Sequence, residues 1–174
     1  MCCDCVITRW QHICHKQQKE MKIKIKKLTD NAVIPHKAHP TDAGFDLTAT
    51  SCTMDNDGSM VYGTGIAVEI PEGYVGLVFP RSSICKKDMI LTNSVGVIDS
   101  GYRSEIKAKF KPTNSFDYYD GSIITESPIG DNMYCIGERI AQLIIMPIPQ
   151  IEFVEADELS DSDRGEGGFG SSGK

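Results

Sequence analysis

The chain has 174 residues, a formal net charge of −6 and a sequence pI near 5.2. This length suits one domain with a hydrophobic core of its own, and the negative charge argues against nucleic acids or anionic membrane surfaces as partners. Four of the seven cysteines lie within residues 1–14, and no apolar run reaches about 18 residues. We therefore expect a soluble cytoplasmic protein without paired disulfides.

Residues 1–20 show neither strand alternation nor a helical apolar stripe, so we interpret them as a disordered appendage or the result of a start codon assigned too early. Their cysteines and histidines could in principle hold zinc, but the paired C-x2-C and H-x3-5-H spacings are missing. The candidate zinc ligands are Cys2, Cys3, Cys5, His12, Cys14 and His15.

Short apolar segments separated by glycine and proline turns dominate residues 21–155. The alternation of lysine and isoleucine from Lys22 is typical of a half-buried strand. Many short strands without a long helical period predict an all-β sandwich or jelly roll, with at most one short helix around residues 82–88 capped by Ser82 or Ser83. The other expected strands are 45–49, 65–70, 74–79, 95–98, 105–111, 140–146 and 151–154.

Three further segments depart from this pattern. Residues 113–133 form a polar excursion that predicts a surface loop or an extra hairpin. Gln142 interrupts the apolar strand 140–146, so its buried amide needs a hydrogen-bonding partner. Residues 156–174 are acidic and then glycine-rich, which predicts a flexible tail unless a ligand orders it.

Residues 93–105 place a carboxylate at a bend between two apolar runs. Val95–Ile98 and the alternating residues after Glu105 flank Asp99, Ser100 and Gly101, and this predicts a hairpin with Asp99 at its turn. Such an aspartate can serve catalysis, although a lone Asp-Ser-Gly more often only stabilises its own turn.

The glycine-rich tail combines groups that suit a nucleotide. Its glycines let backbone N–H groups approach phosphate oxygens, Arg164 offers a bidentate cation, and Phe169 offers a flat face for a base. Ser171 and Ser172 add hydroxyl groups. A glycine-rich terminus alone is usually only a flexible end.

Together with the tail, four motifs in this order make the sequence resemble the trimeric dUTPase family, the deoxyuridine triphosphate nucleotidohydrolases. The resemblance covers about residues 38–173. The motifs are Asp42-Ala-Gly-Phe-Asp46-Leu, Pro80-Arg-Ser-Ser83, Gly96-Val-Ile-Asp-Ser-Gly-Tyr102 and Gly137-Glu-Arg-Ile-Ala-Gln-Leu143.

The resemblance implies a distorted jelly-roll β-sandwich that assembles as a homotrimer, with active sites at subunit boundaries and the tail closing over the substrate. It implies Mg²⁺-dependent hydrolysis of dUTP to dUMP and pyrophosphate, which limits uracil entry into DNA and supplies dUMP for thymidylate synthesis. Asp99 matches the base that activates the attacking water, and Tyr102 matches the ring that excludes a 2'-hydroxyl. Asp46 matches the carboxylate that anchors metal-bound water.

The remaining matches concern the uracil and the phosphates. Asn93, with the backbone near Val97, Ile98 and Lys107, matches the uracil-reading segment, and Phe169 matches the ring stacked on the base. The matches to phosphate-contacting groups are Arg81, Ser82, Ser83, Gln142, Arg164, Gly170 and Ser171.

Some positions depart from the family or have simpler interpretations. Ser83 and Ser104 stand where relatives carry glycine, and Ser104 matters only if its φ is positive. Arg139 and Glu138 favour a strand-end ion pair over a substrate contact, and Cys52, Cys85 and Cys135 are most simply buried apolar residues. A dCTP deaminase of the same superfamily and a nucleotide-binding sensor or inhibitor remain the alternative functions.

Overall fold

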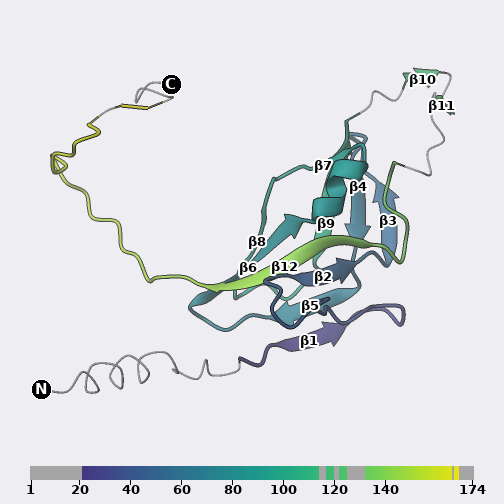
Figure 1. The fold of residues 1–174 in the computed structure, drawn as a ribbon, viewed down its shortest axis with the longest axis horizontal. Helices are drawn as coiled ribbons and strands as arrows, with labels where there is room; N and C mark the ends of the chain where they lie inside the picture. Colours follow the sequence, from purple (N-terminus) through teal and green to yellow (C-terminus); the bar gives the residue numbers. More distant parts are fainter. Residues whose placement is uncertain (1–20, 114–116, 120–121, 125–131, 166, 169–174) are drawn as a thin grey trace, which may run out of the picture.

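The computed structural model describes residues 21–113, 117–119, 122–124, 132–165 and 167–168 (Figure 1). Nearly all the regular structure is β-strand. In chain order the elements are β1 (Lys24–Lys27), β2 (Phe45–Thr48), β3 (Ser51–Met54), β4 (Met60–Gly63), β5 (Ile66–Glu69), β6 (Tyr74–Pro80), the 3-10 helix η1 (Ser82–Lys86), β7 (Met89–Leu91), β8 (Gly96–Ile98), β9 (Lys107–Pro112), β10 (Asp117–Tyr119), β11 (Ser122–Ile124) and β12 (Arg139–Pro147).

Two four-stranded antiparallel sheets form the body of the protein. One has the strand order β2-β12-β6-β8 and the other has the order β3-β4-β9-β7. A two-stranded sheet of β1 and β5 adds to this body. The predicted all-β jelly-roll sandwich is therefore confirmed.

The core lies where both sheets present their apolar faces. In β9, Ala108 and Phe110 point inward between the outward lysines, as period-two alternation requires. Phe110 packs edge-on against Tyr62 of β4, with ring centroids 5.8 Å apart. Leu47, Ile140 and Leu143 from the other sheet belong to the same buried cluster. Burial of these side chains from both sheets is the main force that holds the sandwich together.

The short helix differs from its prediction. It is a five-residue 3-10 helix, Ser82–Lys86, and its N-cap is Arg81, whose side chain forms no capping hydrogen bond. The expectation that Ser82 or Ser83 caps the helix was therefore wrong. The turn begins one residue earlier than expected because Ile84 N–H donates to the Arg81 carbonyl at 2.9 Å.

The bend at Asp99 also differs from its prediction. The strands that flank it do not pair, because β8 joins β6 in one sheet and β9 joins β4 and β7 in the other. The bend is thus a connection between the two layers of the sandwich rather than the turn of a hairpin. Its turn is closed by a hydrogen bond from Tyr102 N–H to the Asp99 carbonyl at 3.0 Å.

The strand prediction needs correction in two respects, and the prediction for the polar excursion is supported. Residues 151–154 form no strand and are exposed, while β3, β4 and β7 were not expected. Within the excursion 113–133, β10 and β11 pair antiparallel, which supports the extra hairpin. Residues 1–20 and their zinc candidates lie outside the described residues.

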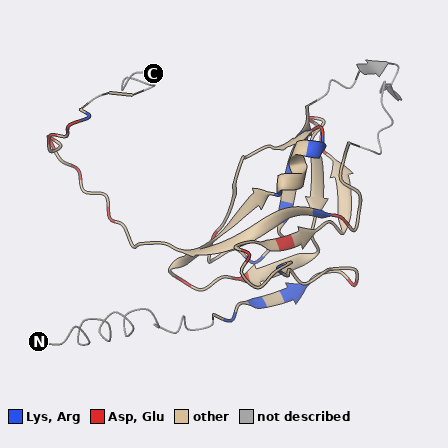
Figure 2. Cartoon of the chain, in the orientation of Figure 1, with Lys and Arg blue, Asp and Glu red and all other residues tan. Residues whose placement is uncertain are grey.

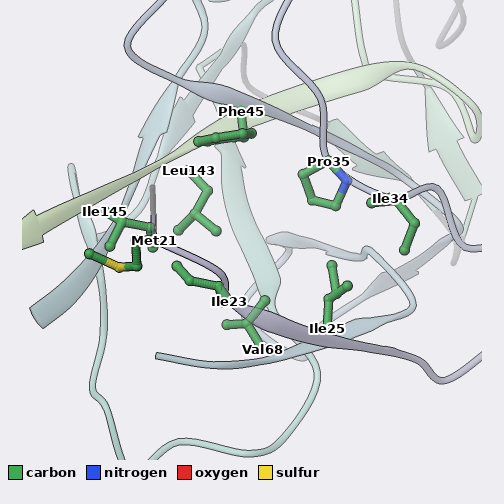
Figure 3. Close-up of a pocket in the computed structure, with 9 residues that line it drawn as sticks. All are labelled: Met21, Ile23, Ile25, Ile34, Pro35, Phe45, Val68, Leu143 and Ile145. Carbon is green, nitrogen blue, oxygen red and sulfur yellow. The ribbon is translucent and has the colours of Figure 1, made fainter. Parts of the chain in front are cut away.

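An apolar cavity of about 210 Å³ lies between β1 and the sheet that contains β2 and β12 (Figure 3). Ile23 just before β1, Ile25 of β1 and Phe45 of β2 line it. The exposed face of β1 is basic, whereas the tail after β12 carries mainly acidic residues (Figure 2). In the part of the chain that the structure describes, no helix has the length and apolar character needed to span a membrane.

Candidate active site

Asp46 of β2 is the centre of an ionic cluster at the ends of β2, β6 and β12. Its Oδ1 accepts a hydrogen bond from Arg81 Nε at 2.7 Å, and its Oδ2 accepts one from Arg139 Nη1 at 2.9 Å. Asp46 is only 8% exposed, so the two arginines replace hydrogen bonds that water would otherwise supply to its carboxylate. Two guanidinium groups around one carboxylate leave one positive charge in excess, which suits a polyanionic ligand.

The structure thereby assigns Arg139 a role that the sequence prediction missed. Arg139 pairs with Asp46, and Glu138 instead lies 3.4 Å from Lys87 Nζ, so the expected Glu138–Arg139 ion pair is wrong. A β-bulge causes the change. Between Arg139 and Ala141 the pairing with β2 shifts register, which sends Ile140 and Ala141 into the core and Arg139 toward Asp46.

Arg81 extends this cluster toward the turn at η1. Its Nη1 lies 3.4 Å from Ser83 Oγ and 3.4 Å from the Arg139 carbonyl. The predicted phosphate-contacting residues Arg81 and Ser83 are therefore adjacent, and Ser82 between them is exposed. A guanidinium and two hydroxyls on one tight turn can donate several hydrogen bonds to phosphate oxygens.

Gln142 lies directly opposite Asp46 in the β2–β12 pairing. Its Nε2 donates to the Pro80 carbonyl at 3.0 Å, which supplies the partner that this half-buried amide was expected to need. Gly44 packs against the same side chain, because a Cβ built on Gly44 would lie 2.5 Å from Gln142 Oε1. The glycine of the first motif therefore makes room for the amide of the fourth motif.

Asp99 and Tyr102 lie together on the connection between β8 and β9. Both side chains are exposed in the single chain. Tyr102 Oη donates to the Glu105 carbonyl at 2.9 Å, which fixes the ring beside the bend. Glu105 in turn accepts a hydrogen bond from Gly65 N–H at 2.8 Å and lies 3.5 Å from Lys107 Nζ.

Asn93 precedes β8 in a tight backbone turn. Ser94 has a φ of +58°, and Val95 N–H lies 2.5 Å from the Asn93 carbonyl. A Cβ on Gly96 would lie 3.6 Å from Asn93 Nδ2, so the amide lies over the start of β8. Of the predicted uracil-reading residues, Asn93 thus lies just before β8, and Val97 and Ile98 lie on it, where Val97 is 62% exposed.

The acid and the phosphate turn are well separated within one chain. In the β6–β8 pairing Ile98 lies opposite Gly76, whereas Arg81 follows Pro80 at the other end of β6. Gly76 and Pro80 are four residues apart, which corresponds to about 13 Å along an extended strand. Asp99 comes after Ile98 and is therefore displaced still further from Arg81.

The tail is also separate from the sheets (Figure 1). Its last hydrogen bond to the body runs from Ile148 N–H to the Gly73 carbonyl at 2.8 Å. Among the described residues, Arg164 forms a hydrogen bond only within the tail, from Nε to the Gly167 carbonyl at 2.8 Å, and its side chain is exposed. The other predicted tail contacts, Phe169, Gly170 and Ser171, lie outside the described residues.

Two further sequence expectations are settled by the structure. Ser94 is the only described non-glycine residue with a positive φ, so the serine at position 104 needs no glycine conformation. The expectation of buried cysteines is wrong for Cys85 and Cys135, which are exposed, and Cys52 is half-buried.

The acidic residues do not form a metal cage. Across residues 21–113 and the other described stretches, no group of three His, Cys, Asp or Glu side chains lies close enough to hold a metal ion. Both oxygens of Asp46 already accept hydrogen bonds from arginines. This donor set fits an ion that arrives on substrate phosphates and keeps its own waters, as Mg²⁺ commonly does.

Comparisons with known proteins agree with this geometry. The dUTPase family model matches residues 30–121 and 130–173. The deoxyuridine 5'-triphosphate nucleotidohydrolase of Nautilia profundicola is 41% identical over 156 residues, which cover 88% of this chain and 100% of that protein. The corresponding protein of Thermobifida fusca is 37% identical over 155 residues, covering 88% of this chain and 79% of that protein.

A solved structure shows the same similarity in three dimensions. The dUTPase of Staphylococcus bacteriophage 80alpha with dUPNHPP superimposes with a TM-score of 0.73 at 36% identity, covering 88% of this chain and 99% of that chain. The family match spans every motif described above, including the tail. The chain therefore belongs to the dUTPase family.

Proposed function

We propose that the chain is a dUTP diphosphatase, which hydrolyses dUTP to dUMP and pyrophosphate by attack of water on the α-phosphate. The observation that carries this proposal is the cluster of Asp46, Arg81 and Arg139 beside Ser83 and Gln142, in a chain of the dUTPase family. Its excess positive charge suits a triphosphate. Its product dUMP would feed thymidylate synthesis, and loss of dUTP would limit uracil in DNA.

The bend supplies the chemistry at the nucleoside. Asp99 holds and deprotonates the attacking water, and Tyr102, fixed by its bond to the Glu105 carbonyl, packs under the deoxyribose and leaves no room for a 2'-hydroxyl. Asn93 and the backbone near Val97, Ile98 and Lys107 read the uracil edge. Cytosine would leave these groups unpaired, at a cost of about 1–3 kcal/mol for each buried group.

The ionic cluster supplies the chemistry at the phosphates. Arg81, Ser82, Ser83 and Gln142 would contact phosphate oxygens or the waters of a bound metal ion, and Asp46 would hold that ion through water. Bound Mg²⁺ would neutralise charge on the triphosphate. Arg139 holds the second oxygen of Asp46 and so orients the carboxylate toward the substrate side.

A homotrimer explains how distant groups reach one substrate. Asp99 and Arg81 lie at opposite ends of β6, and Arg164 lies on a tail without contacts to its own body among the described residues. Phe153 is 97% exposed and Leu159 is 90% exposed, which is costly unless another copy covers them. We infer that the tail, with Phe169, Gly170 and Ser171, closes a site built by neighbouring subunits in the cytoplasm.

The test is pyrophosphate release from dUTP, UTP, dTTP and dCTP with Mg²⁺ and with EDTA. We expect turnover of dUTP alone and its loss in EDTA. Equal turnover of UTP would contradict the role of Tyr102, and ammonia release from dCTP would support the deaminase alternative. Binding of dUTP without turnover would indicate a nucleotide sensor.

A further inference from the structure

The phenol of Tyr134 is a buried polar group that the mechanism above does not use. Tyr134 is 6% exposed, and its Oη is one of two buried side-chain oxygens, among the described residues, without a hydrogen-bonding partner. A buried hydroxyl without a partner is unfavourable, so such a group in a core needs an explanation.

The ring of Tyr134 is held firmly from several sides. It packs against Phe110 with centroids 5.4 Å apart and edge-on against Tyr62 at 6.2 Å. The Tyr134 carbonyl accepts a hydrogen bond from Tyr62 Oη at 2.9 Å. The position of its hydroxyl is therefore set by the core and does not depend on a ligand.

The same residue supports the turn at η1. Lys87, which follows η1, lies over the Tyr134 ring at 5.1 Å, and its Nζ donates to the Met133 carbonyl at 2.7 Å. Burial raises the pKa of Tyr134, while the neighbouring Ser83 hydroxyl and Arg81 guanidinium lower it to a smaller extent. The phenol is therefore protonated at neutral pH and lies next to Ser83 and Arg81.

We propose that Tyr134 is a positioning residue: its hydroxyl, unpaired in the free chain, donates its proton to Ser83 Oγ when nucleotide is bound and so directs the only Ser83 proton toward a substrate phosphate oxygen. This inference rests on the proposed function. A serine hydroxyl has one proton and two acceptor sites. Arg81 Nη1, 3.4 Å away, faces one acceptor site, and the Tyr134 proton would occupy the other. A phosphate oxygen only accepts, so the Ser83 proton is left for it.

Without the Ser83 hydroxyl, Tyr134 would have no route to the phosphate. Replacement of Ser83 by glycine should therefore remove any effect of the Tyr134 hydroxyl on the nucleotide, and this makes the proposal testable as a coupled pair.

The experiment measures the Kd of the non-hydrolysable imido analogue of dUTP, together with the thermal unfolding midpoint. Tyr134→Phe removes only the hydroxyl, and we expect a three- to tenfold weaker Kd with an unchanged or higher midpoint. In the Ser83→Gly background the same change should alter the Kd less than twofold. Tyr62→Phe is the matched control, since it removes a hydroxyl from the same aromatic cluster and should lower the midpoint without weakening the Kd.

The outcomes separate this inference from the proposed function. Wild-type protein that neither binds the analogue nor hydrolyses dUTP would overturn both. Wild-type protein that binds normally, with Tyr134→Phe at the wild-type Kd, would overturn the role of Tyr134 alone. A loss of affinity that persists in the Ser83→Gly background would also overturn it, because the hydroxyl would then act by another route.

Discussion

The ionic cluster and the bend with its tail differ in how far one chain assembles them. Asp46 holds Arg81 and Arg139 through contacts of 2.7 and 2.9 Å, and its side chain is mostly buried. By contrast, Asp99, Tyr102 and Arg164 are exposed, and the hydrogen bond of Arg164 in the part of the chain that the structure describes stays within its own tail. We therefore propose that folding of one chain builds the phosphate-binding part of the site, whereas the reacting part depends on substrate and on neighbouring copies.

The largest expected effect concerns the exposed acid. Asp99→Asn keeps the shape of the side chain but removes the base, and we expect kcat for dUTP to fall about 10³-fold. Because Asp99 is exposed and only its backbone closes the turn, the midpoint of thermal unfolding should not change. Affinity for the imido analogue should stay within a few-fold of wild type. A mutant with wild-type turnover would show that another group is the base.

Removal of the tail should have the next largest effect. Deletion of residues 164–174 removes Arg164 and the groups after it, and we expect kcat/KM to fall about 10²-fold because one phosphate contact and the closure are lost. The fold should be unaffected, since the described hydrogen bonds of Arg164 stay within the tail. Full activity of the shortened enzyme would contradict closure of the site by the tail.

Mixing two mutants tests whether the tail of one copy acts on the bend of another. Asp99→Asn chains and tail-deleted chains are each expected to be nearly inactive alone. If the tail of one copy closes over the bend of another, refolding the two together should restore part of the activity. Continued inactivity of trimers that contain both chains would show that each tail serves its own bend, and sedimentation would verify that mixed trimers formed.

A smaller effect is expected within the folded cluster. Gly44→Ala would place a Cβ 2.5 Å from Gln142 Oε1, so the amide must move away from its position opposite Asp46. We expect kcat/KM to fall about tenfold, in line with a displaced positioning group. The control is Gln142→Ala, since Gly44→Ala should have little further effect once that amide is absent. Equal losses in both backgrounds would mean that Gly44 matters for another reason.

The smallest expected effect is on stability. It concerns the ion pairs of Lys109, which lie outside both the ionic cluster and the bend with its tail. The hydrogen bond from Lys109, which is 3.0 Å from Asp57, lowers the pKa of Asp57 to about 2. A lowered folded-state pKa contributes stability above the unfolded value of about 3.9, and that contribution is lost as pH falls through about 2.

Lys109→Met should therefore lower the unfolding midpoint slightly at pH 6, and the difference from wild type should shrink by pH 2. Lys111→Met on the same strand is the control, because no ion pair of Lys111 is found among the described residues. An equal difference at both pH values would mean that the loss comes from packing and not from the charge on Asp57.

The sequence predicted the fold better than it predicted the contacts of the site. Alternation revealed β9 and an apolar run revealed β12, but β3 is too polar to show a clear pattern, and residues 151–154 are exposed instead of paired. Arg139 was misassigned because the bulge that turns it toward Asp46 leaves no mark on local spacing. The candidate residues could be named from motifs, whereas their distances depend on pairings between distant strands.

Neighbouring residues of β2 face two different environments. Phe45 lines the apolar cavity in Figure 3. Asp46, the next residue, binds the guanidinium groups of Arg81 and Arg139 on the opposite face of β2. A register shift of β2 by one residue would exchange the two faces, because it would place the Asp46 carboxylate in the apolar cavity and the Phe45 ring among the arginines. An insertion or deletion that shifts this pairing would thus damage folding and turnover together, so a stability screen and an activity screen should reject the same length variants there.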